Sequence, residues 1–133
     1  MGVDYSASAG YGIKLDSQVD DIAQLAVAAG YVPWGYEDLP EEEWDIDDYE
    51  AVDYLAKKYG LAYVTVGNSY SGEEVWIIGE VMSWSMYDAV QSDELRVFKI
   101  GDNTEIAQTV EQMRRDLNLS SDHVGYWGGM HVY

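Results

Sequence analysis

The sequence contains no cysteine and no long apolar run, and it has only seven basic residues among 133. Without cysteine the chain can form neither a disulfide framework nor a thiolate metal site, which fits a reducing compartment. No apolar run approaches the roughly 18 residues of a membrane span, and residues 1–10 lack the basic and apolar regions of a signal peptide. We therefore expect a cytoplasmic protein that does not span a membrane.

The shortage of basic residues leaves most of the 25 acidic side chains uncompensated, so the formal net charge is −18 at pH 7. A field this negative repels nucleic acid and anionic membranes, and it attracts basic proteins. The charge therefore predicts a basic partner protein, and it argues against direct binding to nucleic acid or to a membrane.

The remaining composition is that of a folded protein, because 47% of the residues are hydrophobic and 14% are aromatic. A chain of this length can bury one core but is too short for two ordinary domains. We therefore expect a single domain over residues 1–133, with an acidic helical or loop insertion at about 31–59.

Apolar residues alternate with other side chains from Val3 to Leu15, which is the period of a half-buried strand. Gly10 and Gly12 in this strand either bend it or let another backbone approach closely. Further strands are predicted at 61–67, 75–84, 95–100 and 124–133, with a hairpin turn at 68–72, while 83–91 fits a strand or one helical turn.

Three helices are indicated by capping residues and by apolar side chains that recur every three or four positions. Their expected limits are Asp16 or Ser17 to Ala29, Asp47 or Asp48 to Tyr59, and about Ile106 to Leu117, with a short helical turn from Pro40 to Glu43. Together the elements predict an α+β fold. It is a two-layer sandwich in which helices pack on one face of an antiparallel or mixed sheet of about five strands.

The acidic residues are concentrated between Glu37 and Asp53, a stretch with ten acidic and no basic side chains that we call the acidic segment. One interpretation is a helix start with a solvated surface, and it accounts for Asp47, Asp48 and Glu50 as cap and first-turn residues. It does not account for six others, since neighbouring like charges at ~4 Å repel by roughly 1 kcal/mol even in water. These six are Glu37, Asp38, Glu41, Glu42, Glu43 and Asp45.

A second interpretation is that the acidic segment imitates the phosphates of a nucleic acid. Wound largely as helix, its seventeen residues would span about 25 Å, with one carboxylate per ~2.6 Å against one phosphate per ~1.7 Å on duplex DNA. A protein that neutralises phosphates with lysine and arginine would be attracted to such a surface, and salt would weaken the binding. This hypothesis predicts a DNA mimic, an inhibitor or decoy that occupies the basic groove of a nucleic-acid-binding protein, for example a host-defence or transcription protein.

Aromatic side chains flank the acids, and tryptophan and tyrosine are enriched at the centres of protein interfaces. Most aromatic residues of the chain are expected in the core or the sheet, but Trp34 and Trp44 lie in sequence typical of loops. The predicted partner-binding residues are therefore Trp34, Glu37, Asp38, Glu41, Glu42, Glu43, Trp44, Asp45, Asp47 and Asp48.

A different class of function is a non-enzymatic module that binds a small ligand or a protein on an aromatic sheet surface. In that case the acids would only provide solubility. The two hypotheses differ in geometry, because a mimic needs exposed carboxylates in a ribbon whereas a ligand-binding module needs an aromatic concavity.

The sequence gives only weak indications of a metal site or of a catalytic site. The aspartates at 45–48 offer hard oxygen ligands for calcium, but an EF-hand loop counted from Asp45 would need glycine where Glu50 stands. His123 and His131 are the only histidines, and no nucleophile elbow or comparable motif accompanies them. We therefore expect no enzyme activity, no catalytic residue, no metal site and no cofactor.

Overall fold

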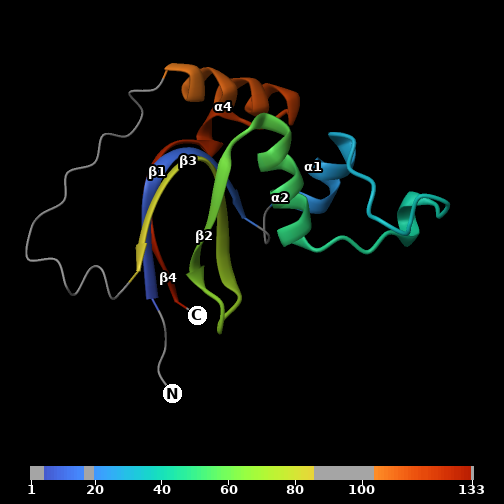
Figure 1. Ribbon diagram of the computed structural model, residues 1–133, viewed down its shortest axis with the longest axis horizontal. Helices are drawn as coiled ribbons and strands as arrows, with labels where there is room; N and C mark the ends of the chain where they lie inside the picture. Colours follow the sequence, from blue (N-terminus) through green and yellow to red (C-terminus); the bar gives the residue numbers. More distant parts are fainter. Residues whose placement is uncertain (1–4, 17–19, 86–103, 133) are drawn as a thin grey trace, which may run out of the picture.

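The computed structural model describes residues 5–16, 20–85 and 104–132, and its centre is a sheet of four strands (Figure 1). The strands are β1 (Tyr5–Asp16), β2 (Ala62–Asn68), β3 (Glu73–Ser85) and β4 (Val124–Val132). They follow one another in the order β1-β3-β2-β4, and the sheet closes on itself because β4 also pairs with β1. All pairs are antiparallel except β2 with β4, whose parallel contact is confined to two residue pairs.

The observed strands confirm four of the five predicted ones, and those predicted ends that fall within the described residues differ by no more than two positions. The fold is α+β with a mixed sheet, as expected, but the described sheet has four strands rather than about five. The strand predicted at 95–100 lies outside the described residues. Of the stretch 83–91, residues 83–85 belong to β3 and the remainder lies outside the described ranges.

Three glycines let β1 and β3 approach each other closely. Gly12 is paired with Gly79, and a Cβ atom on Gly12 would lie only 2.2 Å from the carbonyl oxygen of Ile78. A Cβ atom on Gly79 would lie 2.2 Å from the carbonyl oxygen of Tyr11, and Gly10 is equally crowded. A closed sheet of so few strands has a narrow interior, so the missing side chains permit the closure. The close approach predicted at Gly10 and Gly12 is confirmed.

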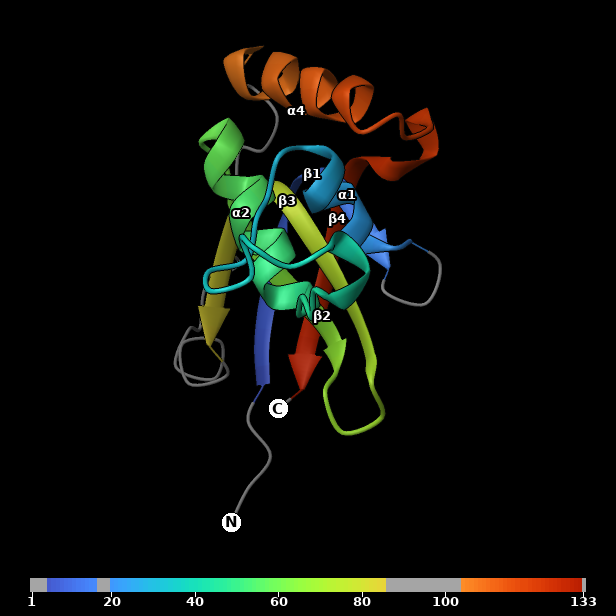
Figure 2. The same ribbon diagram turned by 90° about the vertical axis from the view of Figure 1, so that its right-hand side faces the viewer.

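The three helices α1 (Ile22–Ala28), α2 (Asp48–Tyr59) and α4 (Thr104–Asp116) lie on the outer side of the bent sheet (Figures 1 and 2). Helix α4 crosses above the strands, and α1 and α2 pack against each other. The hydrophobic core fills the space between sheet and helices. Its fully buried members include Ile13 and Leu15 of β1, Ile78 of β3, Leu55 of α2 and Met113 of α4.

Helix α2 has the ends that its sequence predicts. The Asp47 side chain accepts a hydrogen bond from the backbone N–H of Tyr49 and caps the first turn. The helix ends at Gly60, whose φ of +67° is in the left-handed region. None of the helices in the described ranges is long and apolar enough to cross a membrane.

Helix α1 starts later than its sequence predicts. It begins after Asp21, whose side chain caps the first turn, so the cap predicted at Asp16 or Ser17 is wrong. Asp16 is the last residue of β1, and its backbone N–H donates a hydrogen bond to the side chain of Asp20 at 3.0 Å.

Candidate partner-binding surface

The chain between α1 and α2 projects from the rest of the fold (Figure 1). Its base contains Pro33, which is buried. Further out, the half-buried Trp44 donates its indole N–H to the carbonyl oxygens of Tyr36 (2.9 Å) and Leu39 (3.1 Å). Trp44 therefore closes the projecting loop on itself.

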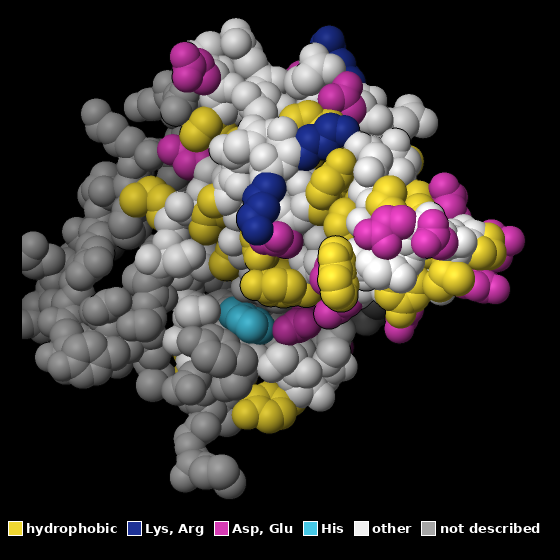
Figure 3. Space-filling view, turned by 45° about the vertical axis from the view of Figure 1, so that its right-hand side comes forward, with side chains coloured by type: hydrophobic (Ala, Val, Ile, Leu, Met, Phe, Trp, Pro, Cys, Tyr) yellow, Lys and Arg dark blue, Asp and Glu magenta, His cyan; other side chains and the backbone are white. Residues whose placement is uncertain are grey.

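Most of the predicted partner-binding acids are exposed on this loop. The exposed ones are Glu37, Asp38, Glu41, Glu42, Glu43, Asp45 and Asp47, and Asp48 is half-buried. Figure 3 shows acidic side chains gathered on the projecting part of the surface, among hydrophobic ones. No lysine, arginine or histidine occurs in the sequence between Lys14 and Lys57, so the loop supplies no basic side chain of its own.

The pKa of Asp48 reflects this crowding of negative charge. Burial raises the pKa of Asp48 above its usual range, and the carboxylates of Asp47 and Asp21 raise it further. A raised pKa means that the folded protein disfavours the ionised carboxylate. The burial of Asp48, and to a smaller extent its acidic neighbours, therefore opposes folding at neutral pH.

Hydrophobic side chains lie among the acids of the loop. Trp34 is 92% exposed, and Val32, Leu39 and Tyr49 remain 48%, 41% and 54% exposed. Gly35, which follows Trp34, has a φ of +86°, a conformation that favours glycine. The loop therefore presents an uncovered tryptophan beside carboxylates, the residue types of an interface anchor with a charged rim.

The acidic segment is only partly helical, so the regular charge spacing predicted from one continuous helix does not hold along it. Glu41–Glu43 form a short 3₁₀ turn, as predicted, and the α-helix starts only at Asp48. Residues 37–40 and 44–47 have no helical structure. Pro40 explains part of this, because it has no backbone N–H to donate and disfavours a helical conformation of the residue before it.

A cleft of about 480 Å³ lies along α2. Its lining residues are Tyr31, Tyr49, Glu50, Asp53, Tyr54, Lys57 and Lys58. This aromatic concavity lies on a helix, whereas the ligand-binding hypothesis expected one on the sheet. The cleft could have been found from the spacing of its residues in the sequence. Six of the lining residues form two rows along α2, and in each row the residues are four positions apart.

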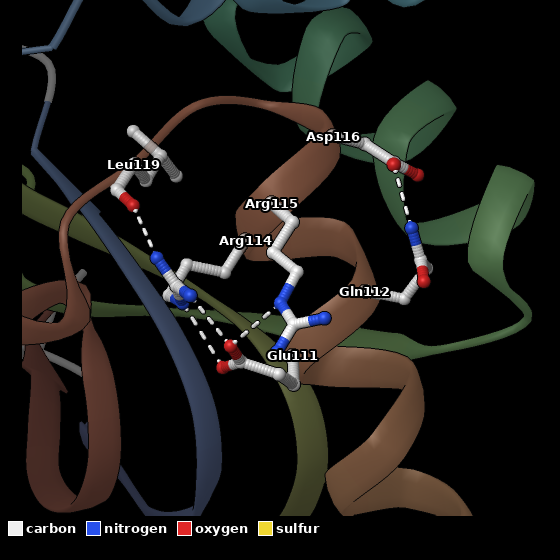
Figure 4. A network of polar contacts seen from close by, with 6 residues as sticks. All are labelled: Glu111, Gln112, Arg114, Arg115, Asp116 and Leu119. Carbon is white, nitrogen blue, oxygen red and sulfur yellow. Dashed lines mark hydrogen bonds and ion pairs between the residues drawn. The ribbon is translucent and has the colours of Figure 1, made fainter.

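Four of the five lysines and arginines in the described ranges contact acids or carbonyl groups of the chain itself. Lys57 pairs with Asp53, and Lys58 donates to a backbone carbonyl. Figure 4 shows Glu111 of α4 bound by both Arg114 and Arg115, and the bond from Arg114 lowers the pKa of Glu111 to about 2. Among the described residues, no ion pair involves residues 37–52.

The two histidines connect separate parts of the chain. Nδ1 of His123 lies 3.3 Å from Oγ of Ser120, and Nε2 lies 3.2 Å from Oδ1 of Asp20. Serine hydrolases use the reverse arrangement, in which Nε2 faces the serine and Nδ1 faces the carboxylate. His131 lies 3.1 Å from Glu74 and links β4 to β3. Both histidines therefore have contacts that join elements of the fold.

Within the described ranges, no three histidine, cysteine, aspartate or glutamate side chains are placed to hold a metal ion together. No family model, curated protein or solved structure matches the chain. Its function is therefore inferred from its own surface.

Proposed function

We propose that the protein is a non-enzymatic inhibitor or decoy that presents its acidic segment to the basic groove of a nucleic-acid-binding protein. The observation that supports this most is the exposure of seven carboxylates on one projecting loop without a basic side chain. A groove that neutralises phosphates with lysine and arginine offers the matching charge. Host-defence and transcription proteins are target classes with such grooves.

In this proposal Trp34 contacts the partner and Trp44 acts by holding the loop. Trp34 is 92% exposed, so its ring is available for burial, whereas the indole N–H of Trp44 is already hydrogen-bonded within the loop. The carboxylates speed the encounter with a basic surface, and salt weakens their attraction. Because residues 37–40 and 44–47 of the segment are not helical, the proposal depends on charge and exposure and not on a regular phosphate-like spacing.

The test begins with a pull-down from native cells at low and high salt, which identifies the partner. A triple variant, Glu41→Gln with Glu42→Gln and Glu43→Gln, then removes three exposed charges. We expect its affinity for the partner to fall about tenfold, since three exposed ion pairs of about 0.5 kcal/mol each sum to about 1.5 kcal/mol. The slope of log affinity against log salt should also become shallower, because fewer charges take part in binding.

The matched control removes three exposed acids from outside the acidic segment, by Glu73→Gln, Glu105→Gln and Asp122→Asn. Both triple variants have a formal net charge of −15, which is −18 plus 3. Only the variant with glutamines at 41–43 should lose affinity for the partner. Equal affinity of the two variants, or of the first variant and the parent, rejects mimicry by the acidic segment.

A further inference from the structure

The cleft of about 480 Å³ along α2 lies on the side of the helix that faces away from the core. Two rows of side chains form its floor, and Tyr31, from the chain that follows α1, completes its lining. The first row consists of Tyr49, Asp53 and Lys57, and the second row consists of Glu50, Tyr54 and Lys58. A cleft of this size is within the usual range of small-molecule sites, about 300–1,000 Å³.

Both lysines of the cleft are bound to acceptors of the chain. Nζ of Lys57 lies 2.8 Å from a carboxylate oxygen of Asp53, and Lys58 donates to the carbonyl oxygen of Ala29. The hydroxyl group of Tyr54 donates to the same carbonyl oxygen at 3.2 Å. These polar groups are therefore engaged within the chain, although both lysines are exposed and the rings of Tyr31 and Tyr54 beside them are half-buried.

The carboxylate of Glu50 differs from that of Asp53. Glu50 is exposed and accepts a hydrogen bond from the hydroxyl group of Tyr31 at 3.1 Å. No ion pair to Glu50 occurs among the residues that the structure describes. Glu50 thus forms no ion pair with a described lysine or arginine, and the other unpaired charge of the cleft is that of Lys58, whose ammonium group is held at the carbonyl oxygen of Ala29.

The tyrosine rings of the cleft are held in place by packing. The ring centroids of Tyr31 and Tyr54 are 5.0 Å apart. Tyr49 contacts Tyr63 and Trp76, each with a centroid distance of 5.8 Å and a near-perpendicular arrangement. The faces of such rings carry partial negative charge, so fixed rings form a surface that attracts cations without a large entropic cost.

We propose that this cleft binds the alkylated ammonium group of a small organic cation, by cation–π contacts with the tyrosine rings and by attraction to Glu50. The net charge of −18 favours cations over anions throughout the surroundings of the protein. Aromatic rings with a nearby carboxylate are a recurrent solution for alkylated ammonium groups, which donate few hydrogen bonds. The inference does not depend on the proposed function of the acidic segment.

The probe is tetramethylammonium chloride, added in an NMR titration of the whole protein while sodium chloride keeps the ionic strength constant. We expect saturable shifts in the ring signals of Tyr31, Tyr49 and Tyr54. Glu50→Gln and Tyr49→Leu should each weaken binding by about threefold to tenfold, the range expected for one such contact. Tyr49→Phe keeps the aromatic ring and should bind like the parent.

The control is Tyr70→Leu, because Tyr70 is also exposed but lies in the turn between β2 and β3. It should leave binding unchanged. A linear response without saturation overturns the proposal, and so does saturable binding that Glu50→Gln leaves unaltered. If Tyr49→Leu does not fold, Glu50→Gln and Tyr49→Phe still decide the result.

The source of the cation is decided by a competition between free choline and a short glycine-flanked peptide that contains trimethyl-lysine. Tighter binding of choline assigns the site to a free small molecule, and tighter binding of the peptide assigns it to a modified protein side chain. The variant with glutamines at 41–43 should still bind tetramethylammonium, since these positions do not line the cleft. Failure of this proposal is therefore distinguishable from failure of mimicry.

Discussion

Two tryptophans ten positions apart have opposite surroundings. Trp34 is 92% exposed, whereas Trp44 is half-buried and donates to two carbonyl groups. Trp44→Ala should therefore lower the free energy of unfolding by about 1–3 kcal/mol, because it leaves carbonyl groups without their donor and removes the ring packing. Trp34→Ala should change it by less than about 0.5 kcal/mol. Urea denaturation of both variants checks this, and an equal loss for the two would contradict it.

Glycine is required at some strand positions and replaceable at others. A Cβ atom at Gly12 would lie 2.2 Å from the Ile78 carbonyl oxygen, whereas one at Gly125 of β4 would have no atom within 4 Å. Gly12→Ala should therefore reduce the free energy of unfolding by more than about 2 kcal/mol, since the backbones of β1 and β3 would have to separate. Gly125→Ala should have little effect or be slightly stabilising. Thermal melting of the two variants, monitored by circular dichroism, gives the comparison.

At the scale of the elements, α4 offers a test by pH. Arg114 and Arg115 lower the pKa of Glu111 from its usual 4.5 to about 2. A lowered folded-state pKa gives stability that is fully present above the unfolded value, near 4.5, and is lost as the pH falls toward about 2. At pH 6 the parent should therefore unfold at a higher urea concentration than the Glu111→Gln variant. This difference in urea midpoint should shrink steadily as the pH is lowered from 4.5 to 2. A difference that is constant over this range would mean that the carboxylate charge is not responsible.

The helices show which elements the sequence predicts reliably. The ends of α2 follow from Asp47 and Gly60, because caps depend on a few neighbouring residues. The start of α1 was predicted too early, since Asp16, Ser17 and Asp21 are all residue types that can cap a helix and the cap that forms is Asp21. The non-helical stretches 37–40 and 44–47 of the acidic segment were also missed, and the contacts of Trp44 with Tyr36 and Leu39 across them leave no periodic pattern in the sequence.

At the scale of the whole molecule, negative charge extends well beyond the acidic segment. The remaining residues carry 15 acids and all seven bases, so their net charge is −8, which is 7 minus 15. At 0.1 M salt the Debye length is about 10 Å, so repulsion between surface charges closer together than this is only partly screened. Higher salt concentrations screen this repulsion more fully. The melting temperature should therefore increase with sodium chloride from 10 mM to about 1 M.

Calorimetry at several salt concentrations measures this increase. The variant with glutamines at 41–43 should show a smaller increase than the parent, because it starts with less repulsion. A melting temperature that falls between low and moderate salt would show that favourable ion pairs, such as those of Glu111, outweigh the repulsion between acids.

The closure of the sheet is the part of the fold that the sequence did not predict. Alternation identified β1 and β4, and β-branched or continuous apolar residues identified β2 and β3, since each strand carries its own pattern. The neighbours of a strand depend on contacts between distant residues, and no pattern within β2 indicates its short parallel contact with β4. The cleft along α2 was missed in the same way, because Tyr31 joins it from outside the helix.

The pairing of β1 with β4 has a consequence for how the chain folds. Tyr5 is paired with Val132, so the strands that lie side by side are separated by nearly the whole sequence. Bringing such distant residues together costs chain entropy before the contacts can offset it, which slows folding relative to proteins with mainly local contacts. While the chain is being synthesised, β1 can find β3 but not β4. The exposed edge of β1 must therefore avoid wrong partners until the final strand arrives, and the negative charge that disfavours association with other copies of the chain protects it during this interval.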